Sequence, residues 1–264
     1  MPICKLCQQD RELRDSHFLP AAIYAQLRAA GQQNPNPVLM TNRVAVATSR
    51  QITDRVLCGD CEQRFSRLGE AWVLANMYRP DGFRLQDAVA ALQPVQSNND
   101  FAYYSTAGVA GINMDALIYF GMSVFWRASA HRWRNVSGVV MDGIELGPYE
   151  ETIRRFLLGD SFPADTVALV SIWPTRNVMP AAHTPRRGRA PDCHAFNFLI
   201  PGVEFKLLTG GRIPDLLRRM CSNTSRERFI FSSTRIVDDT MSAFMRLAET
   251  GRPSRGLQEM TKRQ

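Results

Sequence analysis

Two pairs of closely spaced cysteines near the start of the chain are the residues most clearly suited to chemistry. The first pair is Cys4 and Cys7, and the second is Cys58 and Cys61. Two residues between paired cysteines allow a tight turn to direct both sulfurs at one ion, and four thiolates at about 2.3 Å satisfy tetrahedral zinc. The sequence therefore predicts one structural Zn²⁺ site held by all four residues.

The expected cellular compartment supports a metal over disulfides. The chain has no run of about eighteen uncharged apolar residues, and it does not begin with a basic stretch followed by an apolar block, so neither a membrane span nor a secretory signal is predicted. A cytoplasmic protein is expected, and a reducing compartment disfavours disulfides. A redox role is disfavoured because two motifs are present and neither lies in a clear βαβ context. The remaining cysteines, Cys193 and Cys221, are expected to be structural.

A histidine motif lies between the two cysteine pairs. The order is Cys4-x-x-Cys7, then SHFLP at residues 16–20, then LCGDCE at residues 57–62. This order resembles the zinc-containing HNH, or ββα-metal, nucleases, which are built on a treble-clef scaffold. The matching residues span about a quarter of the chain. A later segment, residues 125–160, is similar to the second half of bacterial proteins that carry this motif and have no assigned function.

The resemblance implies catalytic roles for residues of this motif. It makes His17 the general base that activates a water beside a divalent ion at the scissile phosphate. Glu62 stands where the family usually has Asn or His, but it lies on the polar face of the predicted helix and is our candidate to join His17 around a hard cation such as Mg²⁺ or Mn²⁺. Glu70, on the same helix face, is a further candidate ligand. The sequence departs from the family because Ser16 and Ser66 stand where metal-binding residues are usual. The alternative is that His17 only orders its loop and that the glutamates are solvated.

Positive charge is concentrated in the last third of the chain. The formal net charge is +7, and residues 176–264 contain 16 Lys and Arg against 8 Asp and Glu. Arginine suits phosphate well, so this bias permits a nucleic-acid partner. The stretch PRRGR predicts backbone contacts with nucleic acid, DNA in the first instance, through Arg186, Arg187 and Arg189. The alternative is a solvated basic surface that reflects codon preference.

The elements that must position these residues can be predicted from periodicity and turn signals. In the first part of the chain we expect a helix after Pro20 that ends at Gly31, a loop at 32–37, extended or hairpin structure at 38–58, and a helix from Gly59 to Pro80. Residues 92–100 are polar and aperiodic, so they are the candidate boundary between two domains.

The second part of the chain should be mixed. We expect a buried helix at 113–133 and a well-signalled helix at 147–160, where Pro148, two first-turn glutamates and Gly159 agree. Strands are predicted at 166–173, 195–200, 203–209 and 228–236, with a hairpin turn at Pro201 and Gly202. Residues 183–192 are expected to form a basic loop, and residues 251–264 a frayed basic tail.

These observations predict an α+β protein with an N-terminal treble-clef, HNH-like zinc module (1–92) and a mixed helical and antiparallel-sheet domain (100–264). The first functional hypothesis is a metal-dependent endonuclease, in keeping with the prophage or phage-defence setting that the resemblance implies. The alternative is a non-catalytic zinc protein that binds nucleic acid or a protein partner, as a homo-oligomer or as part of a larger assembly. No membrane partner is expected.

Overall fold

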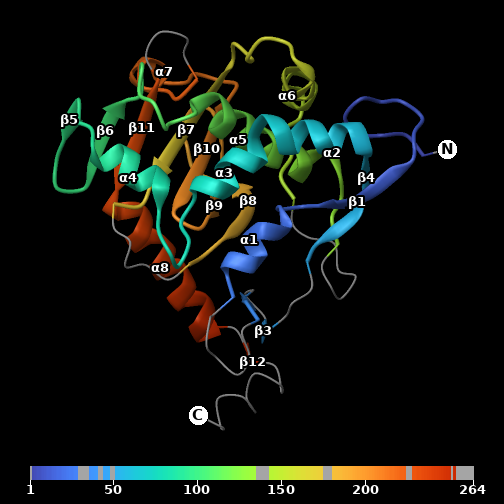
Figure 1. Ribbon diagram of the computed structural model, residues 1–264, viewed down its shortest axis with the longest axis horizontal. Coiled ribbons are helices and arrows are strands. Elements are labelled where there is room, and N and C mark those ends of the chain that lie inside the picture. The colour runs from blue at the N-terminus through green and yellow to red at the C-terminus, as the bar shows by residue number, and fades with distance from the viewer. Residues whose placement is uncertain are drawn as a thin grey trace.

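A computed structural model describes residues 2–28, 36–40, 44–47, 51–134, 143–174, 180–223, 228–250 and 252–253. These residues form a mixed α+β fold, which confirms the predicted fold class at that level. Their strands make a seven-stranded sheet, a two-stranded ribbon and a small three-stranded sheet. Figure 1 shows the large sheet behind a layer of helices, with the ribbon at the N-terminal side of the molecule.

The seven-stranded sheet is antiparallel except where β11 and β7 run parallel. The strands predicted at 166–173, 195–200, 203–209 and 228–236 are all present, and the last ends early. The turn between β9 and β10 contains Gly202 at a φ of +80°, as expected for a hairpin glycine. In spatial order the strands are β5 (Gln96–Ser97), β6 (Phe101–Ser105), β11 (Phe229–Ser233), β7 (Thr166–Ile172), β10 (Val203–Thr209), β9 (His194–Ile200) and β8 (His183–Arg187).

Strand β8 corrects the prediction of a basic loop at 183–192. Its residues pair with β9 at the edge of the sheet, and the register shifts between His183 and Arg186. Pro185 lies at this irregularity, and an edge strand or bulge tolerates a proline because no ladder hydrogen bond from its nitrogen is needed there. The Pro/Gly/Arg composition indicates a loop, but it is equally compatible with an edge strand.

The helix α5 (Met114–Ala130) forms the centre of the core and confirms the prediction for 113–133. It begins at Asn113, whose side chain accepts a hydrogen bond from the Ala116 amide at 2.9 Å. Aromatic side chains of α5 pack on the sheet, with the Phe125 and Phe198 ring centroids 4.9 Å apart and those of Phe120 and Phe205 5.4 Å apart. The sheet therefore meets α5 through closely packed aromatic rings.

A second long helix packs against α5 and is continuous from residue 59 to residue 76. A single π-helical turn interrupts its regular geometry, and helical φ and ψ values continue through both junctions. This turn places Gly69 directly against α5. The three parts of the helix are α2 (Gly59–Phe65), η1 (Ser66–Glu70) and α3 (Ala71–Asn76).

Replacing Gly69 with alanine is expected to destabilise the protein by about 1–3 kcal/mol, because the added methyl group overpacks this helix contact. An added Cβ would lie 2.9 Å from the backbone nitrogen of Phe120, which a side-chain rotation cannot relieve. The control is Gly59→Ala, where the nearest atom, Nε of Arg14, lies at 3.7 Å. Urea unfolding would measure both variants, and equal midpoints for Gly69→Ala and wild type would contradict the prediction.

The two-stranded ribbon lies beside this helix. It consists of β1 (Leu13–His17) and β4 (Thr53–Cys58), which run antiparallel with a bulge after Arg14. The predicted extended structure at 38–58 is present in its described part, and most of the predicted loop at 32–37 lies outside the described residues. The other elements near the ribbon are α1 (Ala21–Gln26), β2 (Val38–Met40), β3 (Val44–Ala47) and β12 (Arg252–Pro253), the last three forming the small sheet.

One of the four remaining helices was predicted. The predicted helix at 147–160 is present as α6 (Tyr149–Leu158) and ends at Gly159, with a φ of +121°. The three other helices of this group were not predicted; in the last of them the chain after β11 turns helical at Thr234 instead of continuing as a strand. Most of the predicted frayed tail, 251–264, lies outside the described residues. The other helices are α4 (Arg84–Ala90), α7 (Asp215–Arg219) and α8 (Thr234–Thr250).

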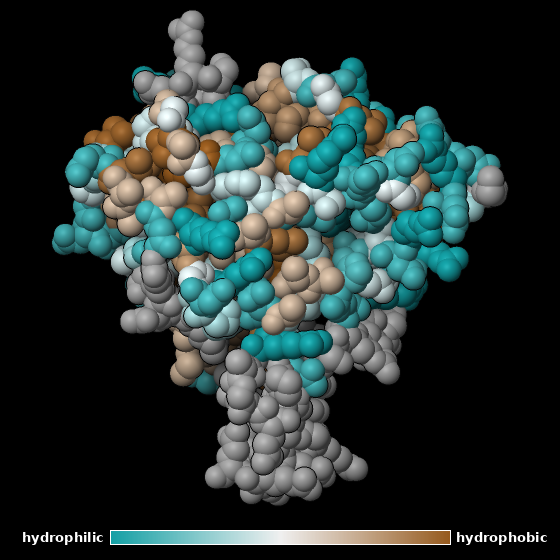
Figure 2. Space-filling model, viewed as in Figure 1, coloured by the Kyte–Doolittle hydropathy of each residue, from teal (hydrophilic) through white to brown (hydrophobic). Residues whose placement is uncertain are grey.

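One hydrophobic core joins the two regions proposed as domains. It contains side chains from Cys4 to Ile230, and the predicted boundary at 92–100 includes strand β5 of the large sheet. The two regions therefore share a core, and independent folding of either region stays a prediction. On the face seen in Figure 2, hydrophobic residues gather in patches separated by hydrophilic ones. Among the described helices, none is both long and apolar enough to cross a membrane.

Candidate metal centre

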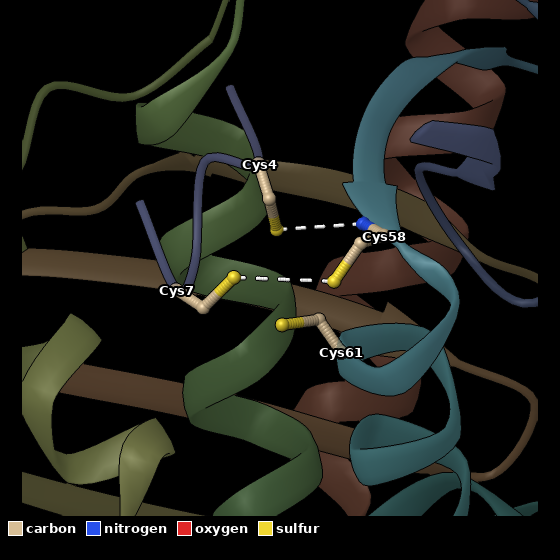
Figure 3. A group of neighbouring side chains, drawn as sticks. All are labelled: Cys4, Cys7, Cys58 and Cys61. Carbon is tan, nitrogen blue, oxygen red and sulfur yellow. Dashed lines mark hydrogen bonds between the residues drawn. The ribbon is translucent and has the colours of Figure 1, made fainter. Parts of the chain in front are cut away.

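Four cysteine sulfurs, from two distant parts of the chain, converge on one point. The Sγ atoms of Cys4, Cys7, Cys58 and Cys61 all lie within 4.8 Å of one another, and those of Cys7 and Cys58 are 3.9 Å apart. Figure 3 shows the sulfurs directed at a common centre. Tetrahedral coordination at about 2.3 Å requires sulfurs about 3.8 Å apart. The cluster can therefore hold a metal ion such as zinc with little adjustment, which confirms the predicted convergence.

The first cysteine pair is held by a tight turn that is fastened to the ribbon. Within the turn, the amide of Gln8 donates to the carbonyl of Cys4 at 2.9 Å, and Gln8 itself adopts a φ of +57°. The amide of Lys5 donates to the carbonyl of Val56 at 3.1 Å, which joins the turn to the end of β4. This contact fixes the first sulfur pair opposite the second.

The second cysteine pair lies where β4 becomes α2. Cys58 precedes the first helical residue, and Cys61 lies in the first turn, where helix amides and the positive end of the helix dipole favour thiolates. The Cys58 amide also donates to the Cys4 sulfur at 3.4 Å. The four thiols are buried except for Cys7, which is half-buried. Both pairs therefore have backbone donors and a shielded environment.

The four thiols of the cluster influence one another's ionisation. A hydrogen bond from the Cys61 thiol lowers the pKa of Cys4 to about 4. The same contact with Cys4 raises the pKa of Cys61, and burial raises the pKa of Cys7. One thiolate therefore suppresses ionisation of its neighbours. A divalent ion removes this conflict, because it stabilises four thiolates at once and releases their protons.

His17 lies at the opposite end of the ribbon from the sulfurs. Leu13 pairs with Cys58, whereas His17 pairs with Thr53 four residues further along β1. At a strand rise of about 3.3 Å per residue, this separation is about 13 Å. The His17 side chain is half-buried, and its carbonyl accepts a hydrogen bond from the Arg127 guanidinium at 3.5 Å.

Glu62 lies at the sulfur end of the same unit. It follows Cys61 directly in the first turn of α2, and its half-buried carboxylate has one buried oxygen without a hydrogen-bond partner in the described part of the chain. Among the described residues, the four cysteines are the only group of three or more potential metal ligands that come together. The structure therefore does not gather His17 and Glu62 with a third ligand, and their catalytic roles stay predictions.

Ser16 has a structural environment within the ribbon. The side chain is 1% exposed, and its oxygen accepts a hydrogen bond from the Leu57 amide at 3.0 Å. This contact joins β1 to β4 beside the bulge. The preceding Asp15 is exposed and lies 3.6 Å from the Arg55 guanidinium on the neighbouring strand. Both side chains therefore have partners within the ribbon itself.

The side chain that links His17 to the long helix is Arg127 of α5, whose role was not predicted. Its guanidinium is 2% exposed, donates to Glu70 at 2.5 Å and lies 4.6 Å from the Phe65 ring centroid. Glu70 is eight residues beyond Glu62, or about 12 Å further along the helix, which places it level with His17. Glu70 is thus neutralised by an arginine. The sequence signal was an arginine within an apolar stretch, because a buried arginine needs an anionic partner.

A hydrogen bond between two side chains joins the end of α5 to the ribbon. The Nε2 atom of His131 lies 2.8 Å from a carboxylate oxygen of Asp54, on the strand β4. This hydrogen bond lowers the pKa of Asp54, and the charge of Arg134 adds to the effect. His131 also packs edge-on against Trp133 at 5.2 Å. His131 therefore has a structural partner.

The predicted nucleic-acid contacts lie in a different sheet from His17. Arg186 and Arg187 are exposed on the edge strand β8, and Arg189 is exposed on the loop that follows. Comparison of the chain with protein-family models, with curated proteins and with solved structures gives no match. The assignment of function therefore depends on the geometry of the site and on the charged surfaces.

Proposed function

We propose that the four cysteines bind Zn²⁺ and that the N-terminal part is a treble-clef-like structural unit. The order of elements supports this proposal: a cysteine turn is followed by β1, β4 and α2, and the second cysteine pair lies at the junction of β4 and α2. Thiolate ligands in tetrahedral spacing select zinc over the hard cations. The ion would fix the ribbon and the long helix relative to each other.

We further propose that the protein binds nucleic acid without hydrolysing it. The observation that carries this proposal is an arginine-rich end of the large sheet. Thr209 pairs with His194, and the Arg212 amide donates to the Asp192 carbonyl at 2.8 Å, so two basic segments meet there. The exposed arginines of this surface, the arginine-rich end, are Arg186, Arg187, Arg189, Arg212 and Arg219, and the exposed acidic residues among them are Asp192 and Asp215.

Phosphate binding by such a surface would be independent of base sequence, because guanidinium groups neutralise the backbone and release counterions. The hydrolytic alternative has weaker support in the same geometry. Ser16 is used by the ribbon, Glu70 is paired with Arg127, and Glu62 lies at the other end of the unit from His17. A structural zinc unit with a basic binding surface accounts for all of these positions.

The test measures the affinity for fluorescent single-stranded and double-stranded oligonucleotides over a range of salt concentrations. The combined variant Arg186→Ala, Arg187→Ala, Arg189→Ala is expected to bind more weakly and to reduce the salt slope by about 0.9 for each duplex phosphate that it no longer neutralises. The matched control replaces three exposed arginines elsewhere: Arg14, Arg67 and Arg84. Equal weakening in both variants, or no binding by the wild type, would overturn the proposal.

The second candidate is the HNH-like endonuclease, with His17 as general base and Glu62 beside Mg²⁺ or Mn²⁺. Two observations favour it. His17 is the last residue of β1, next to the helix that begins at the cysteine cluster, and the His17 side chain is partly accessible to solvent. Plasmid incubated with each metal ion provides the test. Cleavage by the wild type that is abolished in His17→Ala, and kept in a His194→Ala control, would favour hydrolysis. Absence of cleavage with either metal ion supports the binding protein.

A further inference from the structure

An arginine of the C-terminal half reaches the cysteine turn of the metal centre. The Nη1 atom of Arg154, on α6, donates to the carbonyl oxygen of Leu6 at 2.6 Å. The same guanidinium donates from Nε and Nη2 to the two carboxylate oxygens of Glu151, at 2.7 Å each. The Arg154 side chain is 13% exposed. Glu151 therefore fixes the orientation of a guanidinium that is directed at the Cys4–Cys7 turn.

The Leu6 carbonyl is a sensitive point of that turn. Leu6 is fully buried between the two cysteines, and its carbonyl belongs to the peptide that joins it to Cys7. Rotation of this peptide would move the Cys7 sulfur relative to the other three. A hydrogen bond from a charged donor is about twice as strong as one between neutral groups. Arg154 thus restrains the turn from outside the zinc unit.

Arg154 also places positive charge beside the sulfurs. Its hydrogen bond to Glu151 is the main cause that raises its pKa, and the charge of Cys7 adds to this. A divalent ion with four thiolates carries a net charge of −2, so a nearby guanidinium stabilises the bound state. A second arginine, Arg11, pairs with Asp60 of α2. Both of these side chains are well exposed, so this ion pair is weaker than the one between Arg154 and Glu151.

We propose that Arg154 is a positioning residue of the metal centre, which retains the metal by holding the cysteine turn and offsetting its charge. This inference rests on the proposed zinc site. It implies that helix α6, from beyond the predicted boundary at 92–100, supports the site from outside the ring of cysteine ligands. Groups that hydrogen-bond around metal ligands typically change metal affinity by about 10–100-fold when they are removed.

The experiment measures how tightly the full-length, zinc-loaded chain keeps its metal. Zinc is partitioned against chelators of known affinity, and its transfer is followed with a coloured indicator. Arg154→Ala is expected to weaken zinc affinity by about 10–100-fold, and Arg154→Lys, which keeps the charge and removes the fork, by less. The matched control is Arg155→Ala, because Arg155 is exposed and pairs with Asp160 away from the turn.

Circular dichroism of each loaded variant separates loss of the metal from loss of the fold. If Arg154→Ala does not fold, Glu151→Gln provides a second route, because it releases the guanidinium while leaving it in place; it should weaken zinc affinity in the same direction. Zinc affinity unchanged in Arg154→Ala, or reduced equally in Arg155→Ala, would overturn this inference. A wild type that holds no zinc would instead refute the proposed zinc site.

Discussion

Replacing Cys58 with serine is expected to abolish metal binding and to unfold the part of the chain around the ribbon and the long helix. Cys58 is 2% exposed and lies at the junction of β4 and α2, inside the main hydrophobic core. Without an ion, the converging sulfurs at this junction would lose the bonds that hold them together. Zinc binding by comparable cysteine sites supplies about 10–16 kcal/mol at pH 7, which is similar to the whole stability of a domain.

Two measurements check this expectation. Elemental analysis should find about one zinc ion per wild-type chain and almost none in Cys58→Ser. Thermal unfolding and limited proteolysis should show a large loss of stability and new cleavage between residues 1 and 80. The matched control is Cys193→Ser, because Cys193 is half-buried and lies outside the sulfur cluster. A Cys58→Ser protein that keeps its zinc, or that melts at the wild-type temperature, would refute the structural role.

The ligands of the metal centre could be predicted from sequence because their chemistry is local. Each Cys-x-x-Cys pair forms its own turn, and a shared ion is the simplest reason for two such turns in one chain. The helix α5 and strands β7, β9 and β10 could be predicted for a similar reason. Their residues are buried, so long apolar stretches and clear turn signals mark them. Local sequence carries enough information in both cases.

The pairing of Glu62 with His17 stays a prediction, and the structure places the two residues toward opposite ends of the ribbon and helix. Glu62 follows Cys61, and His17 lies in the segment that resembles the HNH motif, so the resemblance suggests that they act together. The ribbon and the helix, however, extend away from the sulfurs, and His17 lies at the distant end. The residue level with His17 is Glu70, and the contact between them passes through Arg127. Arg127 is far from both in the sequence; its position within an apolar stretch indicates a buried anionic partner, but no local pattern indicates which residue that partner is.

The edge strand β8 and the helix α8 were not predicted, for different reasons. The composition of β8 is that of a loop, and only pairing with β9 at the sheet edge makes it a strand. The segment 234–250 does carry helical spacing, since Ile236, Thr240 and Phe244 recur every four residues. The β-branched residues Thr234 and Ile236 favour extended structure, so the sequence predicts a strand through residue 236. Contacts with the rest of the fold therefore determine the secondary structure of both segments.

Replacing Glu70 with glutamine is expected to destabilise the protein by about 3–5 kcal/mol, because it leaves a buried guanidinium without its counter-ion. Arg127 is 2% exposed, and its Nε atom already lacks a hydrogen-bond partner in the described part of the chain. Urea unfolding measures the change in the free energy of unfolding. The control is Glu12→Gln, whose side chain is 78% exposed and is expected to change stability by less than about 0.5 kcal/mol.

A double replacement tests whether the destabilisation comes from the unpaired charge and not from poorer packing. Glu70→Leu with Arg127→Met removes both charges and keeps apolar volume in the core, and such exchanges are often neutral or stabilising. We expect the double variant to recover much of the stability that Glu70→Gln loses. If the double variant is as unstable as the single one, the hydrogen bond from Arg127 to the His17 carbonyl is the contact that matters. If Glu70→Gln matches wild type, the ion pair does not stabilise the contact between the ribbon and the two helices.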